Sequence, residues 1–358
     1  MTTAFYPLRI LDVTRQTDQA IALTLEPDPL LCDAFTFLPG QHLTLRADIG
    51  GEDLRRNYSI CTGPNNGRLR VAIKQVEGGR FSNWALETLR AGGTIEAMAP
   101  RGHFTWKFQA GAARHYLAFA AGSGITPVLS LLEAGLEAEP QSRFTLLYGN
   151  RSSSSIMFLE ELAALKDRYL GRFQLCHFLT AEFDDVALFN GRLDEARIAQ
   201  VLEELVDPKS VDVAFICGPA AMMDAAERTM LDTGLAPDHV LTERFSTGEE
   251  SEAERQATQE IRQRAQGLQM EVRIDGRRRA IAFDAEKGNI LESARASGLP
   301  APYACKAGVC ATCRAKLVSG EVTMKKNYGL SAEEVAQGYI LTCQAIPAGD
   351  GVVVDYDS

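Results

Sequence analysis

Four cysteines near the C-terminal end restrict the fold of this chain more than any other feature of its sequence. Cys305, Cys310 and Cys313 follow the spacing C-x4-C-x2-C in one short segment, and Cys343 comes later in the chain. This spacing is typical of a plant-type 2Fe-2S site, in which the cysteine sulfurs hold the irons. Gly308 and the neighbouring alanines allow backbone N–H groups to turn toward the sulfurs. The sequence therefore predicts that these four cysteines are the metal ligands of an iron–sulfur cluster.

Two other interpretations of these cysteines are open, a zinc site and a disulfide framework. A zinc site usually shows paired C-x2-C knuckles, and disulfides are unusual in a cytosolic chain. The N-terminal residues lack the basic and apolar segments of a signal peptide, and apolar runs are shorter than a membrane span. We therefore expect a cytoplasmic protein without a membrane partner. The remaining cysteines stand singly, as buried and reduced cysteines usually do; they are Cys32, Cys61, Cys176 and Cys217.

The composition is that of an ordinary globular protein, and 358 residues suggest two or three domains. The net charge of −10 argues against a nucleic-acid partner. From Met270 onward, however, eleven basic residues balance eleven acidic ones. Lys306, Arg314 and Lys316 border the cysteine loop, which fits either an acidic electron acceptor or an ordinary mixed surface.

The hydrophobic pattern predicts a multidomain protein with two different domains before the linker. Residues 1–110 read as short strands with Gly and Pro turns and one helix at Ser82–Arg90, which predicts an antiparallel β-barrel. Residues 111–245 alternate apolar strands with helices, which predicts an α/β domain with a doubly wound parallel sheet. The motifs described below make the first an expected FAD-binding domain and the second an expected NAD(P)-binding domain. The clearest expected strands are Ala20–Leu25, His42–Arg46, Leu69–Lys74, Tyr116–Ala120, Phe144–Tyr148, Phe173–Phe178 and Val213–Cys217.

The sequence of the last third of the chain indicates a linker followed by a third domain. Residues 246–267 are rich in polar side chains without sustained apolar periodicity, as expected of a solvated linker. Residues 268–358 begin with alternating strands at Gln269–Ile274 and Arg279–Phe283, followed by a helix at Asn289–Ser297. With the cysteine loop, they predict an α+β ferredoxin domain of the β-grasp type.

A candidate flavin site follows the second group of strands, where Arg56, Tyr58 and Ser59 offer a cation, an aromatic ring and a hydroxyl. Alternate side chains of a strand share a face, so Arg56 and Tyr58 point the same way. A flavin needs a cation for its pyrophosphate, a ring against its isoalloxazine and a hydrogen bond near N5. A glycine turn before the next helix suits phosphate. The candidate residues here are Arg56, Asn57, Tyr58, Ser59 (also catalytic), Gly79, Phe81 and Ser82, and Lys74 is a further candidate for binding a cofactor.

A second candidate site follows the first strand of the α/β region, where Gly122 and Gly124 precede a helix. Glycines permit close approach of a pyrophosphate, although Pro127 replaces the third glycine of G-x-G-x-x-G. Arg151 and the serines after it, at the next strand end, favour NADPH over NADH, unless Arg151 is only a solvated loop residue. The candidate residues are Gly122, Gly124, Thr126, Asn150, Arg151, Cys217 (also catalytic), Gly218, Pro219 and Met222.

Taken in order, these motifs resemble the ferredoxin–NADP reductase superfamily with a C-terminal plant-type 2Fe-2S ferredoxin domain, over essentially the whole chain. More narrowly, five strings resemble the reductase family of ring-1,2-phenylacetyl-CoA epoxidase complexes, which feeds electrons to a diiron oxygenase. The strings are Leu54–Cys61, Gly78–Ala85, Tyr148–Arg151, Phe215–Asp224 and Leu299–Cys313.

The resemblance implies a role for each matching flavin residue. Arg56 would contact the FAD phosphate, Tyr58 would pack on the isoalloxazine, and Ser59 would hydrogen-bond near N5. The turn Gly79–Ser82 would hold the pyrophosphate, and Phe245, which ends the reductase module, would border the flavin.

The resemblance also implies the nucleotide contacts. Gly122, Gly124 and Thr126 would line the NADPH crevice, Arg151 would meet the 2′-phosphate, and Cys217 would approach the nicotinamide.

The implied activity is an oxidoreductase that passes electrons from NADPH through FAD and a 2Fe-2S cluster to a diiron oxygenase of phenylacetate degradation. Two alternatives remain open. The acceptor could be another ring-hydroxylating or multicomponent monooxygenase, since the sequence shows no oxygen-activating site. The chain could instead be a redox-sensing binding module without flavin, against which the intact flavin motif argues.

Overall fold

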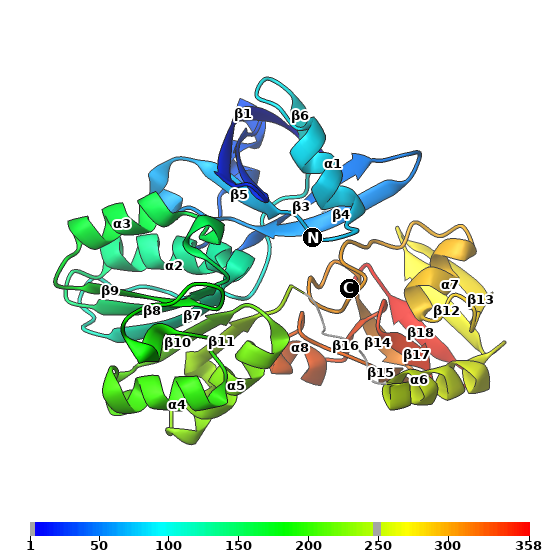
Figure 1. The fold of residues 1–358 in the computed structure, drawn as a ribbon. Coiled ribbons are helices and arrows are strands. Elements are labelled where there is room, and N and C mark those ends of the chain that lie inside the picture. The colour runs from blue at the N-terminus through cyan, green and yellow to red at the C-terminus, as the bar shows by residue number, and fades with distance from the viewer. Residues whose placement is uncertain (1–3, 246–251) are drawn as a thin grey trace. The chain divides into compact units, whose positions relative to one another are not determined.

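The computed structural model describes residues 4–245 and 252–358, which form two compact units. One unit runs from Ala4 to Arg244, and the other contains the chain from Phe245 onward (Figure 1). Within the described residues, no helix is long and apolar enough to cross a membrane.

The first unit begins with a six-stranded antiparallel barrel in the order β4-β3-β6-β1-β2-β5. An antiparallel bridge between Ile60 and Val71 joins the residue after β4 to β5 and closes the barrel. Its core is aliphatic, with Phe81 of α1 among the buried side chains. The elements are β1 (Tyr6–Thr17), β2 (Ala20–Glu26), β3 (His42–Asp48), β4 (Asp53–Ser59), β5 (Leu69–Lys74), α1 (Arg80–Thr88) and β6 (Thr94–Ala97).

The same unit continues into a five-stranded parallel sheet in the order β11-β10-β7-β8-β9. Alternate residues of β7 enter opposite cores: Tyr116 lies with α2 and α3, whereas Phe119 lies with α4 and α5. The sheet is therefore doubly wound, as expected. Its elements are β7 (His115–Ala121), α2 (Ile125–Ala138), β8 (Arg143–Asn150), α3 (Leu159–Arg168), β9 (Phe173–Leu179), α4 (Glu195–Glu204), β10 (Val213–Cys217), α5 (Ala220–Asp232) and β11 (Val240–Glu243).

Polar contacts join the barrel to the parallel sheet's helices within this unit. The Ser130 hydroxyl on α2 donates to the Thr62 carbonyl at 2.6 Å, and the Gly63 N–H donates to Glu133 at 2.7 Å. These bonds fix the barrel beside the carboxyl end of β7, where a nucleotide crevice belongs.

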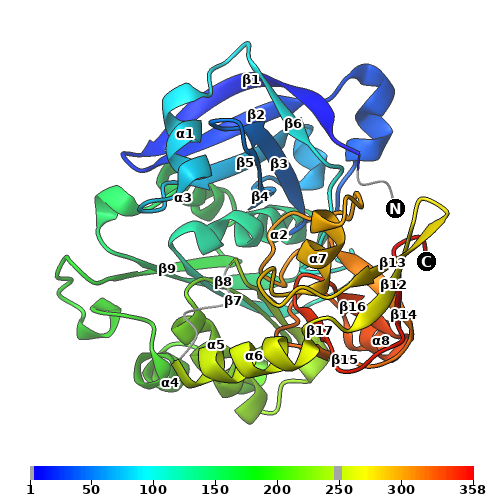
Figure 2. The same cartoon turned by 90° about the vertical axis from the view of Figure 1, so that its right-hand side faces the viewer.

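The second unit has a five-stranded mixed sheet in the order β13-β12-β18-β14-β16 and a small sheet of β15 and β17. Helix α7 lies beside β13 (Figure 2), and its buried residues Ile290, Leu291 and Ala294 belong to the core of this unit. The elements are α6 (Glu252–Ala265), β12 (Gln269–Ile274), β13 (Arg277–Ala282), α7 (Ile290–Ala296), β14 (Arg314–Ser319), β15 (Val322–Met324), α8 (Ala332–Ala336), β16 (Tyr339–Leu341), β17 (Ala345–Pro347) and β18 (Val352–Asp355).

Helix α6 differs from the solvated linker that the sequence predicts over residues 246–267. Ala265 is only 1% exposed, and Ile261 packs on the core of the second unit. With Thr258 they form an i, i+3, i+7 stripe, which suffices to dock a helix. The stripe is easily missed because polar residues surround it. Residues 246–251 of the predicted linker lie outside the described part of the chain.

Candidate functional site

The first group of predicted residues lies at the end of β4. The Tyr58 ring is 5.7 Å from the Phe81 ring, which is in turn 5.5 Å from that of Trp84. Burial raises the pKa of Tyr58, so its phenol stays neutral. Arg56 is exposed, and its guanidinium donates to the Arg55 carbonyl at 2.7 Å. Phe81 therefore supports Tyr58 from the core, while the cation remains at the surface.

The hydroxyl of Ser59 is buried without a hydrogen-bond partner among the described residues. Ser59 is only 2% exposed, and an unsatisfied buried hydroxyl costs free energy. A bound group that accepts or donates a hydrogen bond there would remove this cost. The orphaned hydroxyl of Ser59, directly after Tyr58 in the chain, therefore fits a bound flavin.

Asn57, also predicted to bind a cofactor, has its side-chain amide engaged within the barrel. Thr44 Oγ1 donates to Asn57 Oδ1 at 2.9 Å, and Asn57 Nδ2 lies 3.4 Å from His42 Nε2. These two contacts hold the side chain of Asn57 in place within the barrel.

The glycine turn before α1 is tightly built. A Cβ on Gly79 would stand 2.7 Å from Ser82 Oγ and 2.9 Å from Val76 Cβ, so no larger residue fits without movement. The Ser82 hydroxyl accepts from the Val76 N–H at 3.1 Å, which holds the turn closed. Helix α1 begins here without a side-chain cap, leaving its first N–H groups suited to a phosphate.

The predicted nucleotide residues meet at the carboxyl ends of β7 and β10. Gly122 has φ +54°, and a Cβ on Gly124 would come 2.1 Å from the Cys217 carbonyl oxygen. Gly218 is equally crowded, since its Cβ would stand 2.6 Å from Met222 Cε. Thr126 is buried, and its hydroxyl donates to the Ser123 carbonyl at 2.9 Å. Thr126 therefore stabilises the turn. Pro219 is the N-cap residue of α5.

The sequence assigned no role to two ionisable residues in this region, Glu243 and His42. Glu243 pairs in register with Cys217, and its Oε1 lies 3.8 Å from His42 Nδ1. Burial raises the pKa of Glu243 to about 8, whereas burial and the charges of Arg101 and His103 lower that of His42 to about 4. Burial and Glu243 also raise the pKa of the Cys217 thiol. The position of Glu243 at the end of a parallel strand could have indicated a site residue, whereas nothing in the sequence around His42 indicated one.

Lys74 lies beside the glycine turn, and the charge of Arg151 acts on it. A Cβ on Gly122 would be 3.2 Å from Lys74 Nζ, and burial together with the Arg151 charge lowers the pKa of Lys74. The two positive charges repel each other unless an anion binds between them, and a phosphate group would be such an anion. Asn150 is buried at the end of β8, just before Arg151. Nearby, Glu182 accepts from the Ser153 N–H and hydroxyl at 2.9 and 3.0 Å.

The cysteine loop of the second unit has an unusual backbone. Lys306, Gly308 and Ala311 all have left-handed φ values, of 55°, 77° and 51°. Such turns point successive N–H groups inward. The Ala307 N–H donates to Cys305 Sγ at 3.3 Å, as the sequence predicts.

The four predicted ligands fall into two pairs, Cys305 with Cys310 and Cys313 with Cys343. Within each pair the two thiols share a hydrogen bond, which lowers the pKa of Cys310 and of Cys343 and raises that of Cys305 and of Cys313. In residues 4–245 and 252–358, no three His, Cys, Asp or Glu side chains gather at one ion position. Two pairs suit the two irons of a 2Fe-2S cluster better than a single zinc ion.

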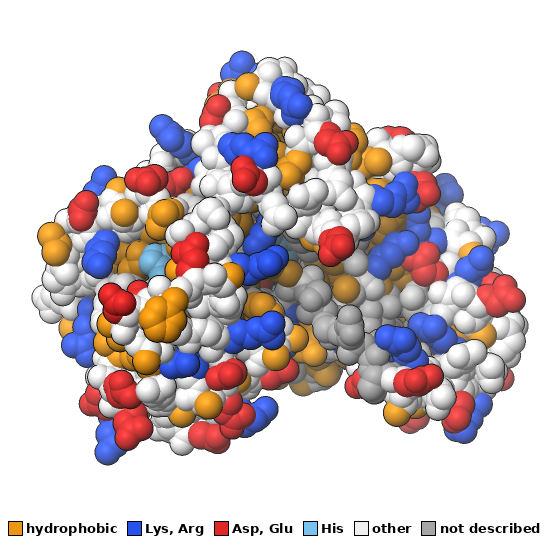
Figure 3. Space-filling model, in the orientation of Figure 1, with side chains coloured by type: hydrophobic (Ala, Val, Ile, Leu, Met, Phe, Trp, Pro, Cys, Tyr) orange, Lys and Arg blue, Asp and Glu red, His pale blue; other side chains and the backbone are white. Residues whose placement is uncertain are grey.

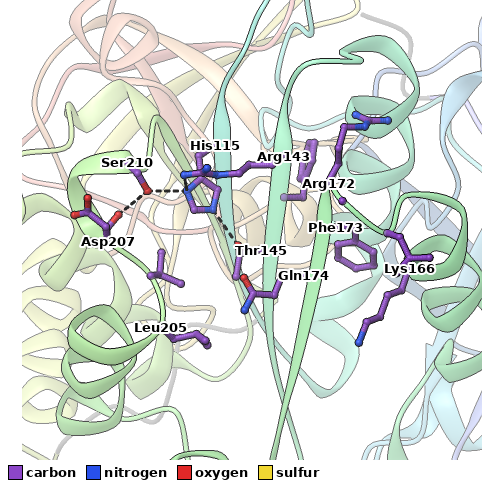
Figure 4. Close-up of a pocket in the computed structure, with 14 residues that line it drawn as sticks. His115, Arg143, Thr145, Lys166, Arg172, Phe173, Gln174, Leu205, Asp207 and Ser210 are labelled. Carbon is purple, nitrogen blue, oxygen red and sulfur yellow. Dashed lines mark hydrogen bonds between the residues drawn. The ribbon is translucent and has the colours of Figure 1, made fainter.

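A cleft of about 620 Å³ lies at the opposite, amino end of the parallel strands (Figure 4). His115 there is fully hydrogen-bonded: Nε2 to Thr145 Oγ1 at 2.9 Å, and Nδ1 to Ser210 Oγ at 3.0 Å. Burial and the Arg143 charge lower the pKa of His115 to about 4, so it stays neutral. Because nucleotides bind at the carboxyl ends of such strands, this cleft is not the nucleotide site.

Basic residues around the cysteine loop are largely paired. Lys306 lies 2.7 Å from Glu292, and Arg314 lies 2.6 Å from Glu334. Basic and acidic side chains are likewise interspersed over the face in Figure 3. The structure thus favours the mixed surface over a basic patch of Lys306, Arg314 and Lys316.

The barrel, the parallel sheet and the cysteine loop together define an electron-transfer oxidoreductase with flavin, nicotinamide and iron–sulfur domains. Three family models match in that order: an oxidoreductase FAD-binding domain at residues 29–106, an oxidoreductase NAD-binding domain at 119–228, and a 2Fe-2S iron-sulfur cluster binding domain at 272–348. The chain belongs to the ferredoxin reductase family that joins these three domains. The expected fold class and family are confirmed.

Curated relatives match along the whole chain. A component of the 1,2-phenylacetyl-CoA epoxidase of Escherichia coli (strain K12) is 44% identical, over 99% of both chains. The ferredoxin reductase component of the 3-ketosteroid-9-alpha-monooxygenase of Rhodococcus rhodochrous is 30% identical, over 98% of this chain and 96% of the relative. Among solved structures, phthalate dioxygenase reductase shares the fold with a TM-score of 0.61 at 23% identity, over 99% of this chain and 100% of that one.

Proposed function

We propose that this protein is the reductase component of a phenylacetyl-CoA epoxidase in phenylacetate degradation, passing electrons from NADPH to the diiron oxygenase component. The observation that carries this proposal is the 44% identity, along both full chains, to a component of such an epoxidase. The paired cysteines and the flavin-facing group at Tyr58 and Ser59 supply the chemistry that a reductase needs.

FAD, when bound, accepts two electrons with a hydride and releases them singly, which links nicotinamide to a one-electron cluster. Tyr58 would present its ring to the flavin, and Ser59 Oγ would complete its missing hydrogen bond near N5. Arg56 and the N-terminus of α1 after Gly79 would hold the pyrophosphate. Phe245, at the start of the second unit, keeps its proposed place near the flavin on the family resemblance alone.

The nucleotide would lie across Gly122 and Gly124, with Cys217 facing the nicotinamide. The buried Glu243 beside Cys217 would retain a proton near neutral pH, because burial raises its pKa to about 8. Lys74 and Arg151 would accommodate the extra phosphate of NADPH. The charge of Arg151, which lowers the pKa of Lys74, supports NADPH over NADH.

A second candidate is the reductase of a different oxygenase. The 30% identity to a 3-ketosteroid-9-alpha-monooxygenase component, also along the whole chain, favours it. A redox-sensing module without flavin is the weakest candidate, because it would leave the Ser59 hydroxyl unsatisfied.

Reconstitution tests the choice. Under anaerobic conditions, NADPH should bleach the flavin absorbance and then that of the cluster in the purified full chain. Adding the oxygenase component of a phenylacetyl-CoA epoxidase, phenylacetyl-CoA and oxygen should then yield epoxide in proportion to NADPH consumed. A Cys310→Ser variant serves as the control, since it should bleach only its flavin. Bleaching without epoxide, but with product from a 3-ketosteroid oxygenase, would establish the second candidate instead.

We further propose that the domains divide at residues 110 and 245, with the ferredoxin domain proper at 268–358. The family matches at 29–106, 119–228 and 272–348 fall inside these limits. A cytoplasmic location is also part of the proposal, on the sequence features described above.

A further inference from the structure

Gln344 directly follows the predicted ligand Cys343, in the turn between β16 and β17, and its backbone is firmly anchored. Its N–H donates to the Leu341 carbonyl at 2.8 Å, and its carbonyl accepts from the Lys325 N–H at 3.0 Å. The residue is only 9% exposed. The direction of its side chain is therefore set by the fold.

The side-chain amide of Gln344 reaches both parts of the ligand set. Nε2 donates to the Lys306 carbonyl at 3.2 Å and to Cys343 Sγ at 3.6 Å. A primary amide carries two N–H donors, so one nitrogen can make both bonds. Lys306 follows Cys305, so the amide connects the cysteine loop to the distant fourth cysteine.

Gly308 holds the Gln344 side chain in this position. A Cβ on Gly308 would stand 2.9 Å from Gln344 Cγ and 3.3 Å from Cδ. Gly308 also has φ +77°, which disfavours any side chain there. The loop thus packs directly on the stem of Gln344, and its N–H groups have little freedom to turn away.

The same amide forms part of the wall of a cleft of about 320 Å³ that reaches Cys343. Arg262, Lys306 and Lys325 also line this cleft. Water can approach Cys343 from this side, and Gln344 supplies a fixed donor to the sulfur there. Hydrogen bonds to cluster sulfurs and solvent exposure both change the reduction potential of an iron–sulfur centre.

We propose that Gln344 is a positioning residue for electron transfer, whose N–H···S bond to Cys343 raises the reduction potential of the cluster. Reduction adds negative charge that the ligand sulfurs share, and a donor aimed at sulfur stabilises this charge more than the oxidised state. The inference rests on cluster ligation by Cys343, but not on the identity of the electron acceptor.

The test compares Gln344→Met, which keeps the length and removes the donor, with Gln344→Glu, which keeps the shape and adds a charge. The midpoint potential of the cluster is measured by EPR-monitored potentiometry of the full chain, with dithionite as reductant. Gln344→Met should shift the reduction equilibrium about tenfold toward the oxidised cluster, which is about 59 mV for one electron. Gln344→Glu should shift it further in the same direction. The flavin potential should stay unchanged in both.

Gln337→Glu is the matched control, because Gln337 is exposed at the C-cap of α8 and the substitution adds the same charge. It should leave the cluster potential unchanged. An unchanged potential in Gln344→Met, with iron and acid-labile sulfide at wild-type content, would overturn the proposal. So would a shift in Gln344→Glu alone, since charge would then explain it.

Gln344→Asn covers the case in which Gln344→Met does not assemble its cluster. It keeps an amide but is one methylene shorter, so a loaded cluster with a lowered potential supports the proposal, and a wild-type potential overturns it. Loss of the cluster from all three variants would also overturn it, because Gln344 would then be needed for assembly. Because dithionite, and not NADPH, reduces the cluster in this test, the measured potentials do not depend on whether the proposed function is correct.

Discussion

The carboxyl of Glu243 at the end of β11 lies 3.8 Å from Nδ1 of His42 in the barrel strand β3. The two side chains are only 12% and 4% exposed. Asn57 Nδ2 faces the other ring nitrogen of His42, which places the imidazole hydrogen on Nδ1, toward Glu243. A buried pair that is neutral near pH 7, with a proton held on the carboxyl, therefore lies between β11 and the barrel.

Because of this pair, we expect the stability of the first unit to depend on pH, and we expect Glu243→Gln to remove this dependence. The folded pKa of Glu243, about 8, exceeds its ordinary 4.5, so the folded state holds an extra proton between these values. Its stabilisation is full below pH 4.5 and is lost as pH rises through 8. Relative to wild type, Glu243→Gln should gain about 1–3 kcal/mol in stability of the first unit between pH 6 and 9. Thermal unfolding at several pH values measures this, and parallel Tm curves for the two proteins would contradict it.

Ser59→Ala should slow the flavin-loaded enzyme without destabilising the apoprotein. The hydroxyl has no partner in the barrel, so its removal should not destabilise the apoprotein, while hydride transfer in the flavin-loaded enzyme should slow by about 10- to 100-fold. Ser130→Ala is the contrasting variant. Its hydroxyl donates to Thr62 at 2.6 Å, and its loss should cost the apoprotein about 1 kcal/mol. Equal apo destabilisation in both variants, by chemical unfolding, would argue against a missing partner at Ser59.

Arg151→Ala should weaken NADPH binding selectively. Loss of a guanidinium that pairs with a phosphate should raise the KM for NADPH by about tenfold and leave that for NADH nearly unchanged. Steady-state kinetics with both nucleotides measures the difference, with the exposed Arg168→Ala on α3 as control. Similar efficiency of the wild type with NADH and NADPH would refute the selectivity itself.

Gly124→Ala should disrupt the nucleotide turn. The new Cβ would lie 2.1 Å from the Cys217 carbonyl, and backbone on both sides must shift to relieve this. We expect a loss of about 2–4 kcal/mol in stability and a rise in the Kd for NADPH. Gly111→Ala is the control, because nothing lies within 4 Å of its Cβ. Unchanged nucleotide affinity in Gly124→Ala would show that the turn does not need this close approach.

The sequence predicts what local patterns encode, and it misses what long-range contacts decide. The bounds of β5 at Leu69–Lys74 and of β10 at Val213–Cys217 follow from apolar runs between turn residues, and both are confirmed to the residue. The contact of His42 with Glu243 is not predictable, because about two hundred residues separate them in the sequence. The pairing of Arg314 with Glu334 was missed for the same reason, since only the fold brings α8 beside the cysteine loop.

Helix α6 provides the last prediction, because its docking depends on a very small apolar stripe. Ala265 is 1% exposed, and a charged side chain there would be buried without a partner. Ala265→Glu should therefore destabilise the second unit by about 2–4 kcal/mol and lower the temperature at which the cluster's visible circular dichroism is lost. Gln263→Glu adds the same charge at an exposed position of the helix and should leave that temperature unchanged. If both variants retain the wild-type transition, α6 does not contribute to the stability of this unit, and the segment behaves as the solvated linker that its composition suggests.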